Sequence, residues 1–173
     1  MKRLLQILIG LFILVLFIFF FYCNNLALAN KETVSYYKEL KKILRDKGYK
    51  PGLLVISTKR FGFHNKIQVN YSGAASKSRH LKGDAIDFLV FDINNDGKRN
   101  STDVNIVTEI LEKEIMKGKG GIGTYINEQS FIDRQMIHID CRNGKGRWSR
   151  WWLKGIYHFG SIKNYCLCFF FQS

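Results

Sequence analysis

Two short stretches of the sequence carry residues that could do chemistry together. In SRHLKGDAIDF, residues 78–88, a histidine and an aspartate stand seven residues apart around a glycine, and in MIHIDC, residues 136–141, a second such pair is separated by one residue. Alternation along AIDFLVF (85–91) places Asp87 on one face of a strand, where an unpartnered buried carboxylate would be costly. A turn before an ordinary core strand is the simpler interpretation, but polar pairs on two strands favour a shared ion.

The residue types indicate which ion this would be. His80, Asp87 and His138 offer two ring nitrogens and one carboxylate oxygen. Three protein ligands of this kind with one open position are typical of a catalytic zinc site. The sequence therefore predicts zinc held by these three side chains.

Both stretches also resemble the motifs of a known family. S-x-H-x-x-G-x-A-x-D, residues 78–87, resembles the first zinc motif of the M15 peptidases, the D-Ala-D-Ala metallopeptidases related to the hedgehog amino-terminal domain. The later GGIGTY…IHIDCR…RW resembles the branch that closes with His-x-Asp, and the likeness spans roughly residues 51–152. It implies a small α+β fold, zinc on the three predicted ligands, and hydrolysis of D-alanyl bonds in peptidoglycan stem or cross-link peptides.

The proton-accepting residue of such a site remains open. A carboxylate must take the proton of the zinc-bound water and deliver it to the leaving amine. Several family members carry an acid three residues before the last histidine ligand, where this chain has Gln135. We expect Asp140 to be the base, because it shares a strand face with His138, and Asp133 is the second candidate. The reverse assignment, with Asp140 on zinc and His138 stabilising the transition state, also stays open.

Two further residues are assigned to the substrate side of the site. The resemblance implies that Arg60 holds the substrate carboxylate, a task that suits a guanidinium group. Ser78 is expected to bond the loop near the metal rather than to act as a nucleophile. Trp148 and its basic neighbours either line a glycan groove or pack against the sheet.

The stretch FDINNDGKRNSTDV predicts a second ion site. Oxygen-bearing groups fall at positions 1, 3, 5, 7, 9 and 12 of a calcium loop, with glycine at position 6 for the sharp turn. The predicted ligands are Asp92, Asn94, Asp96, the carbonyl of Lys98, Asn100 and Asp103. The loop resembles a dockerin repeat, because position 12 is aspartate and a strand enters the loop. We expect a structural calcium that fixes the insertion 92–103; a turn without an ion is the alternative.

The first residues have the pattern of an export signal. Two basic residues precede an unbroken apolar run (7–22), and Ala-Leu-Ala follows (27–29), as in a secretory signal. The run is also long enough for an uncleaved anchor that tethers the chain to a membrane through residues 4–22. The sequence predicts residues 1–29 as a signal peptide or signal anchor. Residues 30–173 are then an exported domain that is periplasmic, associated with the cell envelope or secreted.

The charge of the chain restricts its partners. The formal net charge is +13, and removing residues 1–29 takes away two cations and no acids, which leaves +11. A basic exported protein suits anionic cell-wall polymer or lipid headgroups, and export argues against nucleic acid. We expect a monomer whose partner is peptidoglycan peptide.

The elements that must position these residues alternate between helix and strand. Apolar spacing predicts helices over 33–47 and 104–116. Alternation and apolar runs predict strands over 53–57, 66–71, 85–91, 121–126 and 135–141. The aromatic stretch WSRWWL is expected to pack along one edge of the sheet. This mixture predicts an α+β domain with helices against a mostly antiparallel sheet.

Two classes of function fit these features. An exported zinc peptidase acting on peptidoglycan is the leading hypothesis. The alternative is a non-catalytic, zinc-stabilised, hedgehog-like module that binds the cell wall, and Gln135 at the position of the expected acid favours it.

Overall fold

A computed structural model describes residues 2–72, 75–126, 135–153 and 156–160. One sheet has the strand order β1-β2-β4-β3-β5-β6. Its strands are β1 (Leu53–Ser57), β2 (Ala85–Val90), β3 (Gly121–Ile126), β4 (Met136–Asp140), β5 (Gly146–Leu153) and β6 (Ile156–Gly160). The pair β3–β5 is parallel and the other neighbouring pairs are antiparallel. The predicted α+β class with a mostly antiparallel sheet is confirmed.

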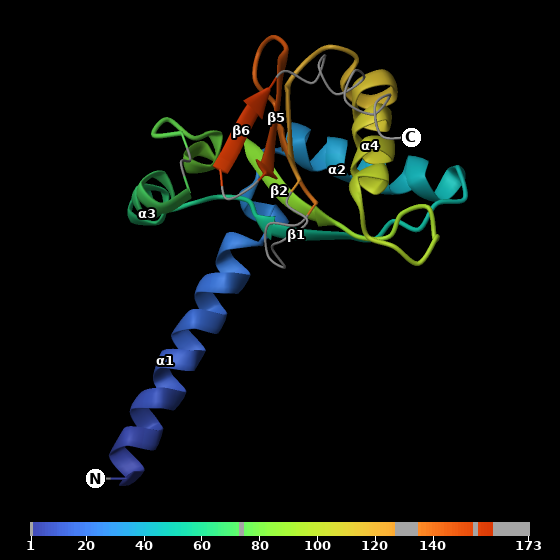
Figure 1. Ribbon diagram of the computed structural model, residues 1–173. Coiled ribbons are helices and arrows are strands. Elements are labelled where there is room, and N and C mark those ends of the chain that lie inside the picture. Colours follow the sequence, from blue (N-terminus) through green and yellow to red (C-terminus); the bar gives the residue numbers. More distant parts are fainter. Residues whose placement is uncertain (1, 73–74, 127–134, 154–155, 161–173) are drawn as a thin grey trace.

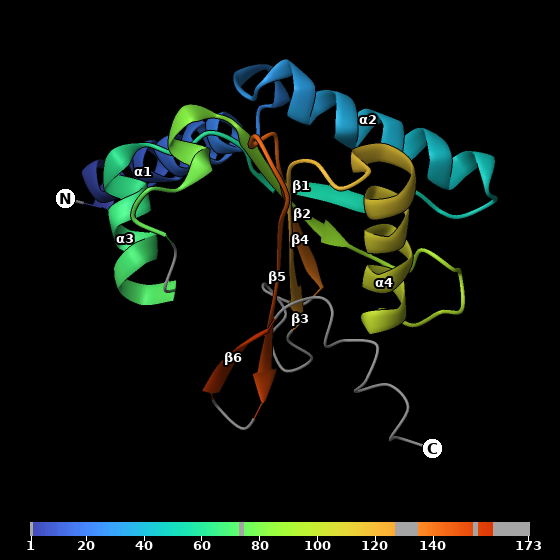
Figure 2. The same cartoon turned by 90° about the horizontal axis from the view of Figure 1, so that it is seen from above.

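Helices flank this sheet on both sides, and one further helix extends away from it. They are α1 (Lys2–Cys23), α2 (Lys31–Asp46), α3 (Gly62–Ser72) and α4 (Ser101–Ile110), which continues as a π-helical segment, Leu111–Met116. Figure 2 shows α2 and α4 on one side of the sheet and α3 on the other. Short 3₁₀ turns occupy Leu26–Leu28 and Arg79–Lys82.

Helix α1 projects away from the domain as a single rod (Figure 1). The stretch Lys2–Phe19 is long and apolar enough to cross a membrane and is not buried; a signal sequence near the N-terminus passes the same test. The predicted apolar N-terminal segment is therefore present as a helix, in a form compatible with export.

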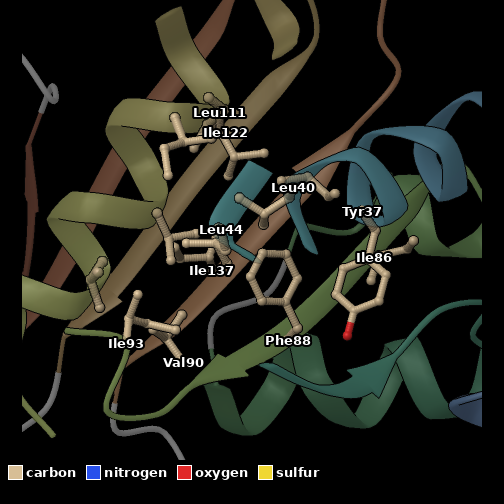
Figure 3. Packing of buried hydrophobic residues seen from close by; sticks show 14 of the residues in the cluster. Tyr37, Leu40, Leu44, Ile86, Phe88, Val90, Ile93, Leu111, Ile122 and Ile137 are labelled. Atoms are coloured by element: carbon tan, nitrogen blue, oxygen red, sulfur yellow. The ribbon is translucent and has the colours of Figure 1, made fainter. Parts of the chain in front are cut away.

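The hydrophobic core lies between the sheet and helices α2 and α4 (Figure 3). Alternation sends Ile86 and Phe88 of β2, together with Ile137 of β4, to this side, and all three are fully buried. Leu40 and Leu44 of α2 pack against them. The intervening residues of β2 and β4 must therefore face the opposite side of the sheet, and that face carries the polar residues singled out in the sequence.

One predicted strand is wrong. Residues 66–71 belong to helix α3, not to a strand. Over six residues, alternation and helical spacing are hard to distinguish, and here Phe63 and Ile67 stand four residues apart on one helical face. The aromatic end of α1 packs beside this helix, through Phe19 against Phe63, and this tertiary contact lies outside any local pattern.

The other predicted elements are confirmed with small shifts of their ends. The helix expected at 104–116 begins earlier, at Ser101, because Asn100 and Asp103 form a reciprocal capping box around its first turn. The helix expected at 33–47 is α2, and Gly48 follows it with a positive φ of 79°. WSRWWL lies within β5, next to β3.

Candidate metal centre

Strand register and one turn bring the three predicted zinc ligands together. Asp87 on β2 lies opposite His138 on β4. Ser78 accepts a hydrogen bond from the backbone N–H of His80 at 3.4 Å and so caps the 3₁₀ turn. Gly83 ends that turn in the left-handed region and directs the chain into β2. Ser78 therefore has the loop-bonding contact that the sequence predicts.

The three side chains converge on one point and are buried. The His80 Nε2 atom lies 3.0 Å from Asp87 Oδ2 and 3.2 Å from His138 Nδ1, and His138 Nδ1 lies 2.7 Å from Asp87 Oδ1. Tetrahedral zinc with bonds of about 2.0–2.2 Å holds its ligand atoms roughly 3.3 Å apart. The three distances are slightly shorter than this, so a small outward movement of the side chains would accommodate a metal ion.

Hydrogen bonds outside this group determine which ring nitrogen carries a proton. The Nδ1–H of His80 donates to the backbone carbonyl of Thr58, and a carbonyl can only accept. The lone pair of a neutral His80 is therefore on Nε2, aimed at Asp87 and His138. Lone pairs that converge in this way are satisfied by a cation, and a ligand histidine whose other nitrogen bonds a carbonyl is usual at metal sites. The His-Asp-His group is a candidate metal site.

Asp140 supports His138 from the side away from Asp87. The His138 Nε2 atom lies 3.2 Å from Asp140 Oδ2, and Arg142 donates to both carboxylate oxygens of Asp140. Asp140 does not join the three converging ligands. This geometry favours His138 as the ligand and Asp140 as the group that orients it, over the reverse assignment.

Replacing this orienting carboxylate should weaken metal binding without abolishing it. We expect Asp140→Asn to lower zinc affinity by about 10- to 100-fold, the usual effect of losing a group that orients a ligand. Competition with a zinc chelator of known affinity measures the change. Asp46→Asn, on the exposed surface of α2, is the matched control, and equal affinity in both variants would contradict the assigned role.

Arg60 lies in the same site and contacts a predicted zinc ligand. Its guanidinium donates to Asp87 Oδ2, and its Nε donates to Ser57 Oγ at 3.0 Å. Its backbone N–H donates to the carbonyl of His80 at 2.9 Å. Only 11% of the Arg60 side chain is exposed. Its charge is therefore paired with that of Asp87. The sequence did not predict this ion pair.

Burial and neighbouring charges act in opposite directions on the pKa values of the three side chains. Burial raises the pKa of Asp87, but its electrostatic interactions with His80, Arg60 and His138 outweigh burial and hold that pKa well below its ordinary value. Burial lowers the pKa of His80. It acts in the same direction on His138, yet the charge of Asp87 and the contact with Asp140 raise the pKa of His138 overall. A metal ion at this site would therefore compete with a proton for His138.

Gly123 leaves room for the Trp148 ring on this face of the sheet. Gly123 on β3 lies between His138 on β4 and Trp148 on β5. A Cβ at Gly123 would come within 2.3 Å of the Trp148 ring. Trp148 therefore lies over a flat strand and reaches His138, with ring centroids 5.2 Å apart. Its Nε1–H donates to the hydroxyl of Tyr125 at 3.1 Å.

A methyl group at Gly123 should displace Trp148. We expect Gly123→Ala to cost about 1–3 kcal/mol of stability, the usual cost of overpacking. The same substitution in a Trp148→Ala background should cost much less, because the clashing ring is gone. Denaturant unfolding of the four proteins of this double-mutant cycle measures the difference. Equal costs in both backgrounds would show that the ring is not what excludes the methyl group.

The predicted calcium loop connects β2 to α4, and its oxygens bind backbone amides. The Asp92 carboxylate accepts from the N–H groups of Asp96 and Gly97. Asp103 is fully buried and accepts from Ile93 and Asn100. Gly97 has the positive φ expected at position 6, 79°. A carboxylate has lone pairs left after such bonds, so this loop is compatible with either an ion or a turn without one.

Several residues of the site were not found from the sequence. Arg142 gave no signal, and Thr58 acts through its backbone. The glycines of GGIGTY did give one, because glycine inside a strand often marks a close approach of another group. The predicted candidate Asp133 lies outside the described residues. Gln135 is fully buried, and its amide has no hydrogen-bond partner among the described residues.

No family model matches this chain, and no curated protein or solved structure matches it.

Proposed function

We propose that the protein is an exported zinc metallopeptidase that hydrolyses D-alanyl bonds in peptidoglycan stem or cross-link peptides. The observation that carries the proposal is the convergence of His80 Nε2, the Asp87 carboxylate and His138 Nδ1. Two imidazoles and one carboxylate suit zinc. The resemblance of both motifs to the M15 peptidases supplies the proposed reaction and substrate.

Zinc bound by these residues would polarise the scissile carbonyl and lower the pKa of its bound water to about 7. Residues of the protein would orient the zinc ligands and balance their charge. Thr58 and Asp140 hold the two histidines in the orientation that presents one nitrogen of each to the metal. Arg60 neutralises Asp87 in the absence of metal. Zinc bound at this site would balance that charge, and the Arg60 guanidinium would then be available to bind the substrate carboxylate.

We assign the proton-accepting role to Asp133 rather than to Asp140. Both oxygens of Asp140 bind Arg142, and these hydrogen bonds, with the contact to His138, outweigh burial and hold its pKa well below the ordinary value. A carboxylate with such a low pKa is a weak base. On this assignment, Asp133→Asn should still bind zinc but lose turnover. Asp140→Asn should instead bind zinc more weakly.

Turnover of purified peptidoglycan tests the proposal. The full chain, solubilised in detergent and loaded with zinc, is incubated with purified peptidoglycan, and released fragments are identified by mass spectrometry. We expect cleavage at D-alanyl bonds that chelator stops and added zinc restores. Asp87→Asn is the inactive control. Wall binding without cleavage, at full zinc occupancy, would support the non-catalytic binding module instead, which the buried Gln135 at the position of the expected acid favours.

We also propose that the loop 92–103 binds a structural calcium ion. With an affinity typical of extracellular calcium modules, Kd about 10⁻⁴–10⁻³ M, 2 mM calcium should stabilise the protein by about 1 kcal/mol. The melting temperature should then rise by about 2–4 °C. Thermal unfolding with calcium, with magnesium and with chelator measures the effect, and Asp92→Ala should remove it. An unchanged melting temperature in calcium would show that the loop is a turn without an ion.

A further inference from the structure

The end of α1 contacts the domain through aromatic rings. Tyr22 stacks on Phe61 with ring centroids 4.6 Å apart and planes inclined by 14°. Phe19 lies 6.1 Å from Phe61 and 6.0 Å from Phe63, between ring centroids. These contacts place α3 beside the domain end of α1, as Figure 1 shows.

The residues that follow α1 are also part of the domain. Leu26 and Ala29 pack against the hydrophobic core. The hydroxyl of the buried Thr58 donates to the carbonyl of Asn25 at 3.0 Å. Removal of residues 1–29 would expose core surface to water and break this hydrogen bond.

The same segment supports the loop that carries His80. The N–H of Asn30 donates to the carbonyl of Gly83 at 2.8 Å. A Cβ at Gly83 would lie 2.6 Å from the carbonyl oxygen of Leu28, so this backbone packs directly on the turn. Thr58, which binds Asn25, is the residue whose carbonyl orients His80. Residues 25–30 therefore contact Thr58, whose carbonyl orients His80, and Gly83, which ends the turn that carries His80.

An apolar surface at the start of α3 continues from the end of α1. We call it the α3 apolar surface. Its members are Phe61, just before the helix, and Phe63 and Ile67 on it, and they are 38%, 62% and 51% exposed. Lys59 and Lys66 stand beside them in the sequence. Aromatic rings at the level of lipid headgroups, with basic residues near anionic lipid, are typical of membrane interfaces.

We propose that α1 is retained as a membrane anchor and that the α3 apolar surface enters the same bilayer face at which α1 emerges. The 22 residues of α1 span about 33 Å at 1.5 Å per residue, which matches a hydrocarbon core of about 30 Å. The occupant of the α3 apolar surface is thus the lipid bilayer to which α1 belongs. This arrangement holds the candidate metal centre close to the membrane and, on the proposed function, would direct it to the peptidoglycan nearest that surface.

Retention is tested on the full chain expressed in a bacterial host. We expect protein in the membrane fraction with the mass of the complete chain, 20.2 kDa, that alkaline carbonate does not release. A product that begins at Asn30 would overturn the proposal. This outcome is independent of peptidase activity, because it concerns the N-terminus and not turnover.

Entry of α3 into the bilayer is tested by depth-dependent quenching. Phe63→Trp and Lys98→Trp variants are reconstituted in vesicles that contain anionic lipid and lipid brominated near the headgroup. The fluorescence of each is compared with that of the unsubstituted chain. We expect bromine to quench the added tryptophan at position 63 at least about twice as strongly as that at position 98, which lies in the exposed calcium loop. Equal quenching at the two positions would overturn the docking of α3, even with α1 intact.

Discussion

His80→Ala should bind less than about a tenth of an equivalent of zinc, whereas the unsubstituted chain binds about one. The variant removes one of three protein ligands, and zinc sites of this type rely on all three. It also leaves the carboxylate of Asp87 and the ring of His138 without the third group that converges with them. On the proposed function, peptidase activity should fall further than the zinc content, by about a thousandfold or more, because the residues of such a site act as a unit.

Metal analysis of the full chain after dialysis measures this result. His64→Ala is the matched control, because His64 lies on α3 and does not belong to the converging group. The control should keep its zinc and its activity. Zinc contents that are equal in the two variants would mean that the metal binds elsewhere, and the site described above would then be a buried ion-pair cluster.

Arg60→Ala should destabilise the metal-free protein by about 3–5 kcal/mol, the cost of removing one partner of a buried ion pair. The Asp87 side chain is only 4% exposed, and Arg60 donates to it directly. Zinc at this site would neutralise Asp87 in place of the guanidinium. The same substitution should therefore cost much less in the zinc-loaded protein, and zinc should raise the stability of the variant more than that of the unsubstituted chain.

Unfolding in denaturant, with zinc and with chelator, measures both quantities. Arg79→Ala is the control, because Arg79 forms an ion pair with Asp84 at 3.7 Å in which 42% of the arginine side chain is exposed. Exposed pairs contribute about 0–1 kcal/mol. If both arginine variants lose equal stability, or if zinc leaves the loss at Arg60 unchanged, then Arg60 is not coupled to the metal site as described.

The three residues of the candidate metal site could be predicted because their signal is local. His80, Gly83 and Asp87 lie within one turn and one strand, and the alternation around His138 places it on the polar face of β4. The α+β class followed from the same periodicities. The antiparallel register of β2 and β4 brings the two stretches together. The sequence implied this pairing, because each stretch carries a histidine and an aspartate that need a common partner.

The supporting residues could not be predicted, because they depend on contacts distant in the sequence. Thr58 lies 22 residues from His80 and acts through its carbonyl. Gly123 matters only because the parallel pairing of β3 and β5 puts Trp148 beside it. Helix α3 was mistaken for a strand, since its apolar face is covered in part by α1. Sequence patterns indicate which groups need a partner but do not identify the partner.

The most direct test of the metal centre is X-ray absorption spectroscopy at the zinc edge on the zinc-loaded full chain. We expect four nitrogen or oxygen neighbours at about 2.0–2.2 Å with the outer-shell signal of two imidazole rings, and little zinc and no such signal in His80→Ala. Sulfur at about 2.3 Å, or an imidazole signal unchanged in His80→Ala, would place the zinc on other residues and contradict the account.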